Sequence, residues 1–332
     1  MSVIFFVFIF FFNLFIFKNL SLITSKLNFY DIPDNYRKIH VDKISKIGGL
    51  ILYFNLTIFF IYEFLFNFSL QGTYLFFTLT ISFLISLYND KKDIKPSYRL
   101  IIFYLIFLIW TLADDQMVIK NLNFDFISLN IELGFYGFFI TPLFMVIFLN
   151  ALNLFDGVNL QSITYYLLFF VFFYLNEIEI NSYLSLTAFL IFFSYYNFKN
   201  KIFLGDSGVT IFAILIIYIT ITNYNSDNET LNCEKIFTIM FLPGIDMLRV
   251  YFLRILTKKK PFEADKNHLH HYLLNFISHK YVFFYQLILN SLIIWAVFIM
   301  NYNYSNVIIF LVLFYILTIS ISHVSKKLSK NS

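Results

Sequence analysis

The chain has 332 residues, of which 59% are hydrophobic and 22% aromatic, and its formal net charge is +4. Only 13% of the residues are charged, against about 25% in soluble domains, so a soluble globular enzyme is excluded and nothing favours a nucleic-acid partner. Because Cys233 is the one cysteine, an intrachain disulfide and a CxxC metal or redox pair are excluded as well.

Apolar runs long enough to cross a bilayer recur along the whole chain, since a span needs about 20 mostly apolar residues. The runs are continuous rather than short and alternating, so they predict helices and not a barrel. We expect an all-α, polytopic integral membrane protein, with a single integral-membrane domain over 1–332 and about eleven spans. The expected limits are 2–18, 48–67, 71–89, 97–113, 134–151, 160–176, 181–197, 207–223, 234–253, 281–300 and 305–323.

The first run is expected to be a membrane helix, because no basic residue precedes it and no small-residue cleavage site follows. The basic residues predict the orientation, because Lys and Arg gather in cytoplasmic loops. With the N-terminus outside, all of the 24 Lys and Arg residues except Lys120 and Lys235 fall on the cytoplasmic side. We therefore expect an N-out, C-in topology.

Polar residues collect in five segments that this topology places on the cytoplasmic side. Ionisable groups at membrane depth are costly, so they are usually paired or functional. The segments are DIPDNYRKIHVDKISKIGG (31–49), YNDKKDIKP (88–96), NALNLFDGVN (150–159), KIFLGDSG (201–208) and DMLRVYFLRILTKKKPFEADKNHLHH (246–271).

Two of these segments have spacings that suit a ligand. Asn150, Asn153 and Asp156 recur every third residue, which places amides and a carboxylate on one stripe of a helix. This stripe is either a polar seam between helices or part of a shell for a hard cation and phosphate oxygens. In GDSG, Asp206 could cap the helix that follows, or it could bind a cation–phosphate pair.

Three histidines of the last segment, His268, His270 and His271, form a histidine patch that admits several interpretations. Zinc is disfavoured, because no cysteine accompanies the histidines and Lys266 would repel a cation. A proton relay is disfavoured, because the patch lies in a loop that is too polar for the bilayer core. A cleft that binds an anionic ligand fits better. No Walker A or G-x-G-x-x-G motif indicates ATP-driven transport or a dinucleotide cofactor.

Taken together and in this order, the five segments resemble the polyprenyl-phosphate N-acetylhexosamine-1-phosphate transferases (glycosyltransferase family 4, the WecA/MraY superfamily). The resemblance runs from Asp31 to about Leu274, and the form PFEADKNHLHH is similar to the WecA-like branch. The matched family patterns are D-x-P-x-x-R-K-x-H…GG, D-D-x-x-D, N-A-x-N-x-x-D-G-x-D, K-x-F-x-G-D-x-G-S and D-x-x-R…R…P-F-x-x-D-x-x-H-L-H-H.

Three positions depart from the family patterns. Asn89 stands where the family has the first Asp of D-D-x-x-D, Asn159 replaces the second Asp after D-G, and Val209 replaces a Ser. Asn89 conflicts with a mechanism that needs a general base at that position. A phosphate monoester has a second pKa of about 6, so a lipid phosphate is already mostly a dianion at neutral pH.

The resemblance implies that a polyprenyl phosphate attacks the β-phosphorus of a cytoplasmic UDP-N-acetylhexosamine and releases UMP, as the priming step of O-antigen or other surface-glycan synthesis. It also implies a bacterial-type inner membrane, a homodimer and a Mg²⁺ ion, with Mn²⁺ as an alternative, held mainly by Asp206 with Asn153 near it. The implied catalytic residues are Asp90, Asp93, Asp156 and Asp206. The implied substrate contacts are Asn89, Asn150, Asn153, Arg254, Asp265, Lys266, His268, His270 and His271.

Other functions remain open at this point. A peptidoglycan-type phospho-sugar transferase shares most of the pattern. A non-catalytic paralogue is suggested by Asn89 and Asn159 alone. A secondary transporter of an anionic solute would need polar residues at mid-bilayer on broken helices, whereas the polar groups here lie at one face.

Overall fold

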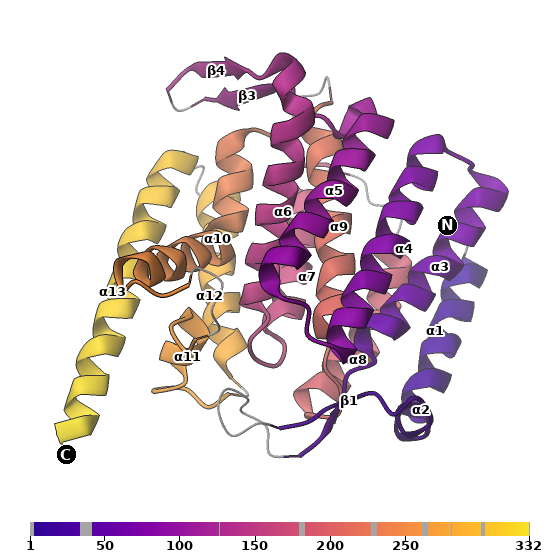
Figure 1. Ribbon diagram of the computed structural model, residues 1–332, viewed down its shortest axis with the longest axis horizontal. Coiled ribbons are helices and arrows are strands. Elements are labelled where there is room, and N and C mark those ends of the chain that lie inside the picture. Colours follow the sequence, from indigo (N-terminus) through magenta and orange to yellow (C-terminus); the bar gives the residue numbers. More distant parts are fainter. Residues whose placement is uncertain are drawn as a thin grey trace. The chain divides into compact units, whose positions relative to one another are not determined.

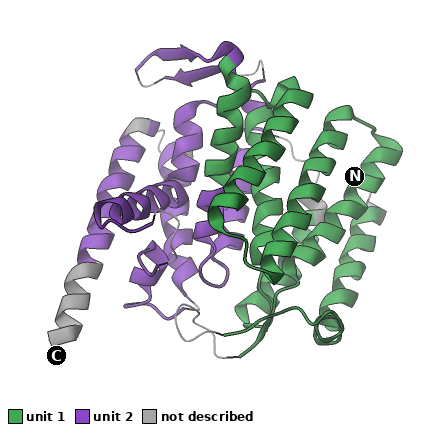
Figure 2. Cartoon of the chain, viewed as in Figure 1, with its two compact units in different colours: residues 1–118, 136–149, 179–222 green, residues 119–135, 150–178, 223–332 purple. Residues whose placement is uncertain are grey.

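The computed structural model describes residues 3–33, 42–125, 127–178, 183–226, 231–260, 265–279, 281–299 and 303–331. Its helices carry most of the chain, and the strands form two small antiparallel sheets (Figure 1). The chain divides into two compact units (Figure 2). Unit 1 comprises residues 1–118, 136–149 and 179–222, and unit 2 comprises residues 119–135, 150–178 and 223–332.

Unit 1 contains the first helices of the chain and the helix that begins within KIFLGDSG. Ser69 caps α4 by accepting the N–H of Gly72 at 3.0 Å, and Pro96 begins α5, where its missing N–H costs no hydrogen bond. The elements are α1 (Val3–Lys18), α2 (Leu20–Leu27), β1 (Tyr30–Asp31), β2 (Ile44–Ser45), α3 (Gly48–Phe66), α4 (Leu70–Lys91), α5 (Pro96–Ala113), the first part of α6 (Gly137–Phe155), α8 (Tyr183–Phe198) and α9 (Gly205–Tyr224).

The interior of unit 1 is built around α9, most of which is buried. α4 contacts it through a hydrogen bond between the hydroxyls of Ser86 and Thr210 at 2.7 Å. α5 contacts it through the stacked rings of Trp110 and Tyr218, whose centroids lie 6.3 Å apart. Because α9 has apolar residues on all sides, it is stable only with neighbours all round, and this fixes its N-terminal residues in place.

Unit 2 contains the later helices and a hairpin. Asn232 caps α10 by accepting the N–H of Lys235 at 2.9 Å. α7 packs against α12, and α13 packs against α10 and α11. The elements are β3 (Asn121–Phe124), β4 (Leu129–Glu132), the end of α6, α7 (Gln161–Leu175), α10 (Cys233–Leu256), α11 (Leu269–Leu273), α12 (Val282–Ile294) with the π-helical turn Trp295–Ile299, and α13 (Tyr304–Asn331).

The β3–β4 hairpin lies at one end of the unit 2 helices, and α11 lies toward the other end (Figure 1). The register of the β3–β4 hairpin sets Leu122 opposite Ile131 and Phe124 opposite Leu129. One face of the hairpin is therefore apolar, and the alternate residues make the other face polar. The hydroxyl of Tyr224 binds the edge of β3, where it accepts an N–H at 2.8 Å and donates to a carbonyl at 3.0 Å.

The predicted all-α, polytopic membrane class is confirmed. Six helices of the described part are long and apolar enough to cross a membrane, and α1 with α2, bent by 68°, makes a seventh if the pair is one span. Each of the remaining expected spans coincides with a shorter apolar helix. These helices are Gln161–Leu175, Leu186–Phe198, Val282–Val297 and Asn306–Ile321. The span count, the orientation and the single domain stay predictions.

The orientation can be tested with single cysteines in a Cys233→Ser background. Asn130 in the hairpin and Ser278 beyond α11 are both exposed, and the expected topology places them on opposite sides of the membrane. We expect a membrane-impermeant maleimide to label Asn130→Cys in intact cells, and to label Ser278→Cys only after permeabilisation. The reverse pattern would show that the chain is inserted the other way round.

Candidate functional site

The carboxylate of Asp90, at the end of α4, caps the start of α9. Its Oδ1 accepts the N–H of Asp206 at 2.9 Å, and its Oδ2 accepts the N–H of Ser207 at 3.0 Å. Gly205 has a φ of +73°, and a Cβ there would meet Asp90 Oδ2 at 2.8 Å. The first N–H groups of a helix lack intrahelical partners and favour an anion, so Asp90 fixes the backbone that carries Asp206.

Lys46 balances the charge of Asp90. Its Nζ lies 3.0 Å from Asp90 Oδ1, and the Asp90 side chain is 0% exposed. Burial lowers the pKa of Lys46, but the carboxylates of Asp90 and Asp206 outweigh burial and the pKa is raised. Lys46 therefore remains a cation at neutral pH. Its chain segment is held in place by a parallel bridge between Ser45 and Ile202.

The two glycines that begin α3 allow the polar segments of unit 1 to approach each other. The N–H of Gly48 donates to the carbonyl of Phe203 at 3.2 Å, and the N–H of Gly49 donates to that of Leu204 at 2.8 Å. A Cβ at Gly49 would overlap the Ser207 hydroxyl and the backbone beyond it. A larger residue would push α3 away from the start of α9.

Asp206 is held by two donors that bind the same oxygen. The amide Nδ2 of Asn89 lies 2.5 Å from Asp206 Oδ2, and Nη1 of Arg99 lies 2.6 Å from it. The Oδ1 of Asn89 accepts the N–H of Ile94 at 2.9 Å. The Asp206 side chain is 31% exposed, so a carboxylate with a fixed orientation remains open to solvent.

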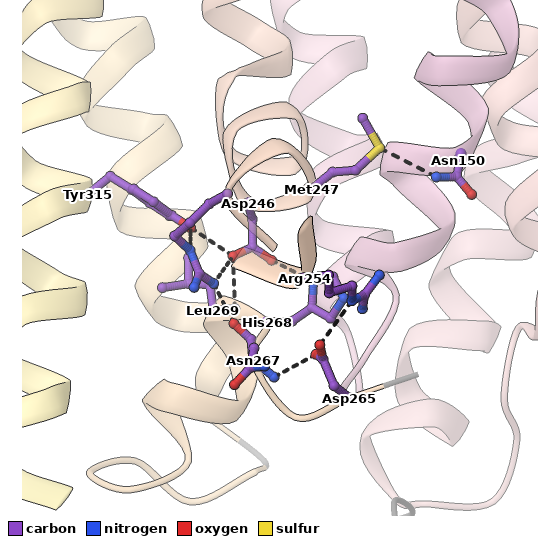
Figure 3. Close-up of polar contacts among 10 residues, drawn as sticks. Asn150, Asp246, Met247, Arg254, Asp265, Asn267, His268, Leu269 and Tyr315 are labelled. Carbon is purple, nitrogen blue, oxygen red and sulfur yellow. Dashed lines mark hydrogen bonds and ion pairs between the residues drawn. The ribbon is translucent and has the colours of Figure 1, made fainter. Parts of the chain in front are cut away.

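In unit 2, the stripe at the end of α6 makes internal polar contacts. The amide of Asn150 donates to the hydroxyl of Tyr251 at 2.7 Å. It also contacts Met247 Sδ at 3.4 Å (Figure 3). Oδ1 of Asp156 accepts the Ser162 hydroxyl at 2.5 Å. The contacts of Asn150 favour the polar-seam interpretation for that residue. They also hold α6 against α10, which carries Tyr251.

The loop that follows α6 packs on the histidine patch. A Cβ at Gly157 would overlap the ring of His270, so only glycine fits there without a shift. The rings of His268 and His270 are stacked, with centroids 5.8 Å apart, and that of His271 lies 4.3 Å from His270. The structure therefore brings the FDG turn (155–157) against the histidine patch.

His270 is neutral at physiological pH. Burial lowers the pKa of His270, the neighbouring His271 and His268 lower it further, and the pKa falls to about 3. This side chain can donate or accept a hydrogen bond, but it supplies no positive charge to an anionic ligand. The prediction that His270 contacts a substrate stays a prediction, now restricted to a neutral imidazole.

Asp246, inside α10, organises the position of His268. Its Oδ2 lies 2.9 Å from His268 Nδ1, and its Oδ1 accepts the Leu269 N–H at 3.0 Å and the Tyr315 hydroxyl at 2.8 Å (Figure 3). Arg249 forms an ion pair with Oδ1 at 2.7 Å. A carboxylate on Nδ1 leaves Nε2 of His268 as the nitrogen that can meet a ligand.

A second ion pair holds the loop that precedes the histidines. Arg254 Nε lies 2.9 Å from Asp265 Oδ2, and the Arg254 side chain is 3% exposed. Burial raises the pKa of Asp265, but its contacts with Arg254 and with the Asn267 N–H outweigh burial and lower it. Arg254 thus anchors the loop, whereas the neighbouring Lys266 is exposed.

The predicted site residues fall into two groups. In unit 1, Asn89 and Asp90 meet Asp206, whereas Asp93 is exposed on the loop between α4 and α5. Unit 2 contains the rest, and Asn153 is half-buried on α6. The ion proposed to bind both Asp206 and Asn153 would join the two units and stays a prediction. Residues 34–41 of the first motif and 261–264 of the last lie outside the described residues.

Several interacting residues were given no role in the site from the sequence. Asp246 and Arg249, three residues apart in an apolar helix, carried a signal, because buried ionisable groups need partners. Lys46 and Arg99 look like the basic residues that flank any membrane span. Tyr315 carried no signal, because one tyrosine in an apolar helix is not distinguishable from its neighbours.

The donors of the site suit a hard cation. Within the described ranges, no three His, Cys, Asp or Glu side chains are grouped to hold a metal ion. Mg²⁺ commonly uses only one or two protein carboxylates and takes its other ligands from phosphate and water. A half-open carboxylate such as Asp206 fits this pattern and not that of a closed zinc site.

The chain is similar to known proteins over most of its length. The sequence pattern of glycosyl transferase family 4 matches residues 72–224. The undecaprenyl-phosphate alpha-N-acetylglucosaminyl 1-phosphate transferase of Pasteurella multocida is 25% identical over 265 residues, which cover 76% of this chain and 73% of that protein. The Escherichia coli protein of the same name is 21% identical over 284 residues, covering 79% and 75%.

The close contact between Gly157 and His270 predicts a stability difference between two glycine substitutions. Gly157→Ala should lower the free energy of unfolding by about 1–3 kcal/mol, because the added methyl displaces the His270 ring. Gly244→Ala is the matched control, since a Cβ there meets nothing within 4 Å and alanine is the better helix former. Thermal unfolding in detergent measures both. Equal melting temperatures would contradict the packing.

The lowered pKa of His270 predicts a dependence of stability on pH. The unfolded chain, with a pKa near 6.5, binds a proton that the folded chain excludes until about pH 3. The contribution of His270 to the free energy of unfolding is therefore fully present above pH 6.5. Between pH 6.5 and about pH 3 the free energy of unfolding falls by about 1.4 kcal/mol per pH unit. In His270→Gln, melting temperatures measured between pH 4.5 and 6.5 should vary less. An unchanged slope would mean that His270 titrates normally.

Proposed function

Because the chain matches the sequence pattern of glycosyl transferase family 4 over residues 72–224, we propose that it transfers an N-acetylhexosamine 1-phosphate from a UDP-sugar to a polyprenyl phosphate and releases UMP. The relatives are named for undecaprenyl phosphate and an N-acetylglucosaminyl 1-phosphate group, and we assign the same substrate classes to this chain. The observation that carries the proposal is the solvent-open carboxylate of Asp206, oriented by Asn89 and Arg99 at the start of α9.

In the proposed reaction, an oxygen of the lipid phosphate forms a bond to the β-phosphorus of the UDP-sugar. The bond from that phosphorus to the bridging oxygen breaks, and UMP leaves with the electron pair. The nucleophile needs no general base, because the second pKa of a phosphate monoester is about 6 and the dianion dominates at pH 7. This agrees with Asn89, whose amide cannot accept a proton.

The side chains of this protein would then supply orientation and positive charge, which is most of what phosphoryl transfer requires of an enzyme. Asp206 and Asn153 would hold Mg²⁺ or Mn²⁺, which when bound neutralises developing phosphate charge as a Lewis acid. Lys266 is exposed and can reach an anionic ligand. His268 offers Nε2 to the sugar nucleotide, because Asp246 binds its other nitrogen.

The proposal places this activity at the inner face of a bacterial cytoplasmic membrane. A polyprenyl phosphate lies in the bilayer and a UDP-sugar is made in the cytoplasm, so a site at the cytoplasmic helix ends reaches both. The product would prime O-antigen or another surface glycan. A homodimer belongs to the same proposal and is testable by the size of the purified protein in detergent.

The experiment that tests the proposal uses purified protein with undecaprenyl phosphate, Mg²⁺ and a panel of UDP-N-acetylhexosamines, and measures UMP release. The sugar that yields UMP together with a lipid-linked diphosphate sugar identifies the donor. Chelation by EDTA should stop the reaction. Failure with every donor, at full Mg²⁺ and with folded protein, would reject the proposed activity.

Asp206 provides the sharpest variant. Asp206→Asn should reduce UMP release by at least about a hundredfold, as the loss of a principal charge-stabilising contact does. The variant should still fold, because the cap on α9 is formed by the Asp206 backbone and not by its side chain. Glu132→Gln, an exposed acid-to-amide change in the hairpin, is the matched control. Near-normal turnover in Asp206→Asn would refute its assigned role.

A further inference from the structure

The amide of Asn89 has a fixed orientation. The backbone N–H of Ile94 can only donate, so the atom of Asn89 that it meets at 2.9 Å must be the oxygen. The nitrogen of the same amide then faces Asp206 Oδ2 at 2.5 Å. Asn89 is itself buried, and its two hydrogen bonds leave the amide no freedom to turn over.

Arg99 donates to the same oxygen from α5. Its Nη1 lies 2.6 Å from Asp206 Oδ2, and its own side chain is mostly buried. Oδ2 thus accepts one neutral and one charged donor, and charge-assisted hydrogen bonds are the stronger kind. No described residue forms a hydrogen bond or ion pair with Oδ1 of Asp206. The two oxygens of this carboxylate therefore have different surroundings.

We propose that Asn89 is a positioning residue which, together with Arg99, holds Oδ2 of Asp206 and leaves Oδ1 as the oxygen that takes a divalent cation. The identity of the cation as Mg²⁺ rests on the proposed function. The assignment of the two oxygens goes beyond it. Asn89 is then a working part of the site in this chain and not the remnant of a lost acid.

The proposal distinguishes an amide from a carboxylate at position 89. In Asn89→Asp, one oxygen keeps the hydrogen bond from Ile94, and the other occupies the place of the amide nitrogen, 2.5 Å from Asp206 Oδ2. Two ionised carboxylates at that separation repel each other unless a cation or a proton lies between them. Arg99 and Lys46 relieve the repulsion only in part, because with Asp90 included they are two positive charges against three carboxylates.

The test is thermal unfolding of the full chain in detergent, with EDTA and then with saturating MgCl₂. We expect Asn89→Asp to melt several degrees below the parent protein in EDTA, and to gain at least about twice the parent's rise in melting temperature from MgCl₂. Asn89→Ala should also melt lower in EDTA, but its gain from MgCl₂ should be no larger than the parent's. Asn275→Asp, an exposed change of the same chemistry, should match the parent in both buffers.

An Asn89→Asp variant that melts with the parent protein in EDTA would overturn the proposal, and so would an equal gain from MgCl₂ in the two proteins. Because unfolding is measured without substrates, these outcomes do not depend on transferase activity. If the parent releases no UMP but shows the expected pattern of melting, the proposed function fails and the assignment of Asn89 stands. If UMP is released but the melting pattern is absent, the proposed function stands and the assignment of Asn89 fails.

Discussion

The capping of α9 by Asp90 is the interaction on which the rest of unit 1 depends. A buried carboxylate accepts the first free N–H groups of a buried helix, and Lys46 compensates its charge. The energetic cost of burying both ions is offset only because every contact is short and directed. Because the start of α9 is fixed in this way, the backbone position of Asp206 is defined. Asn89 and Arg99 then set the orientation of its carboxylate.

Unit 2 is organised around a different carboxylate. Asp246 lies within the apolar helix α10, where it pairs with Arg249 of the same helix. It also binds His268 and the Leu269 N–H at the start of α11, and the hydroxyl of Tyr315 on α13. The loop that contains His268 would otherwise have few constraints, since α11 is a single short helix. In both units a buried acid organises backbone and side chains, and a more exposed group beside it is left to meet a ligand.

The sequence was sufficient for the architecture, because long apolar runs have few alternative structures in a bilayer. It also identified the motifs that contain Asn89, Asp206, His270 and the FDG turn, and the structure shows the contacts of Asn89 with Asp206 and of Gly157 with His270. It could not assign the partner of each group. Arg99 looked like a topology signal, Tyr315 was one of 24 tyrosines, and the need for glycine at 157 depends on a ring more than a hundred residues away.

The cap on α9 also constrains how the chain is assembled during synthesis. Asp90 and the N–H that it accepts are 116 residues apart, so α4 emerges from the ribosome roughly ten seconds before α9 at ordinary elongation rates. Throughout that interval Lys46, already synthesised, is the partner from this cluster that can shield the carboxylate at the membrane boundary. The Lys46–Asp90 salt bridge can therefore neutralise the carboxylate during insertion. Asp90 then accepts the N–H groups of α9 once that helix has been translated.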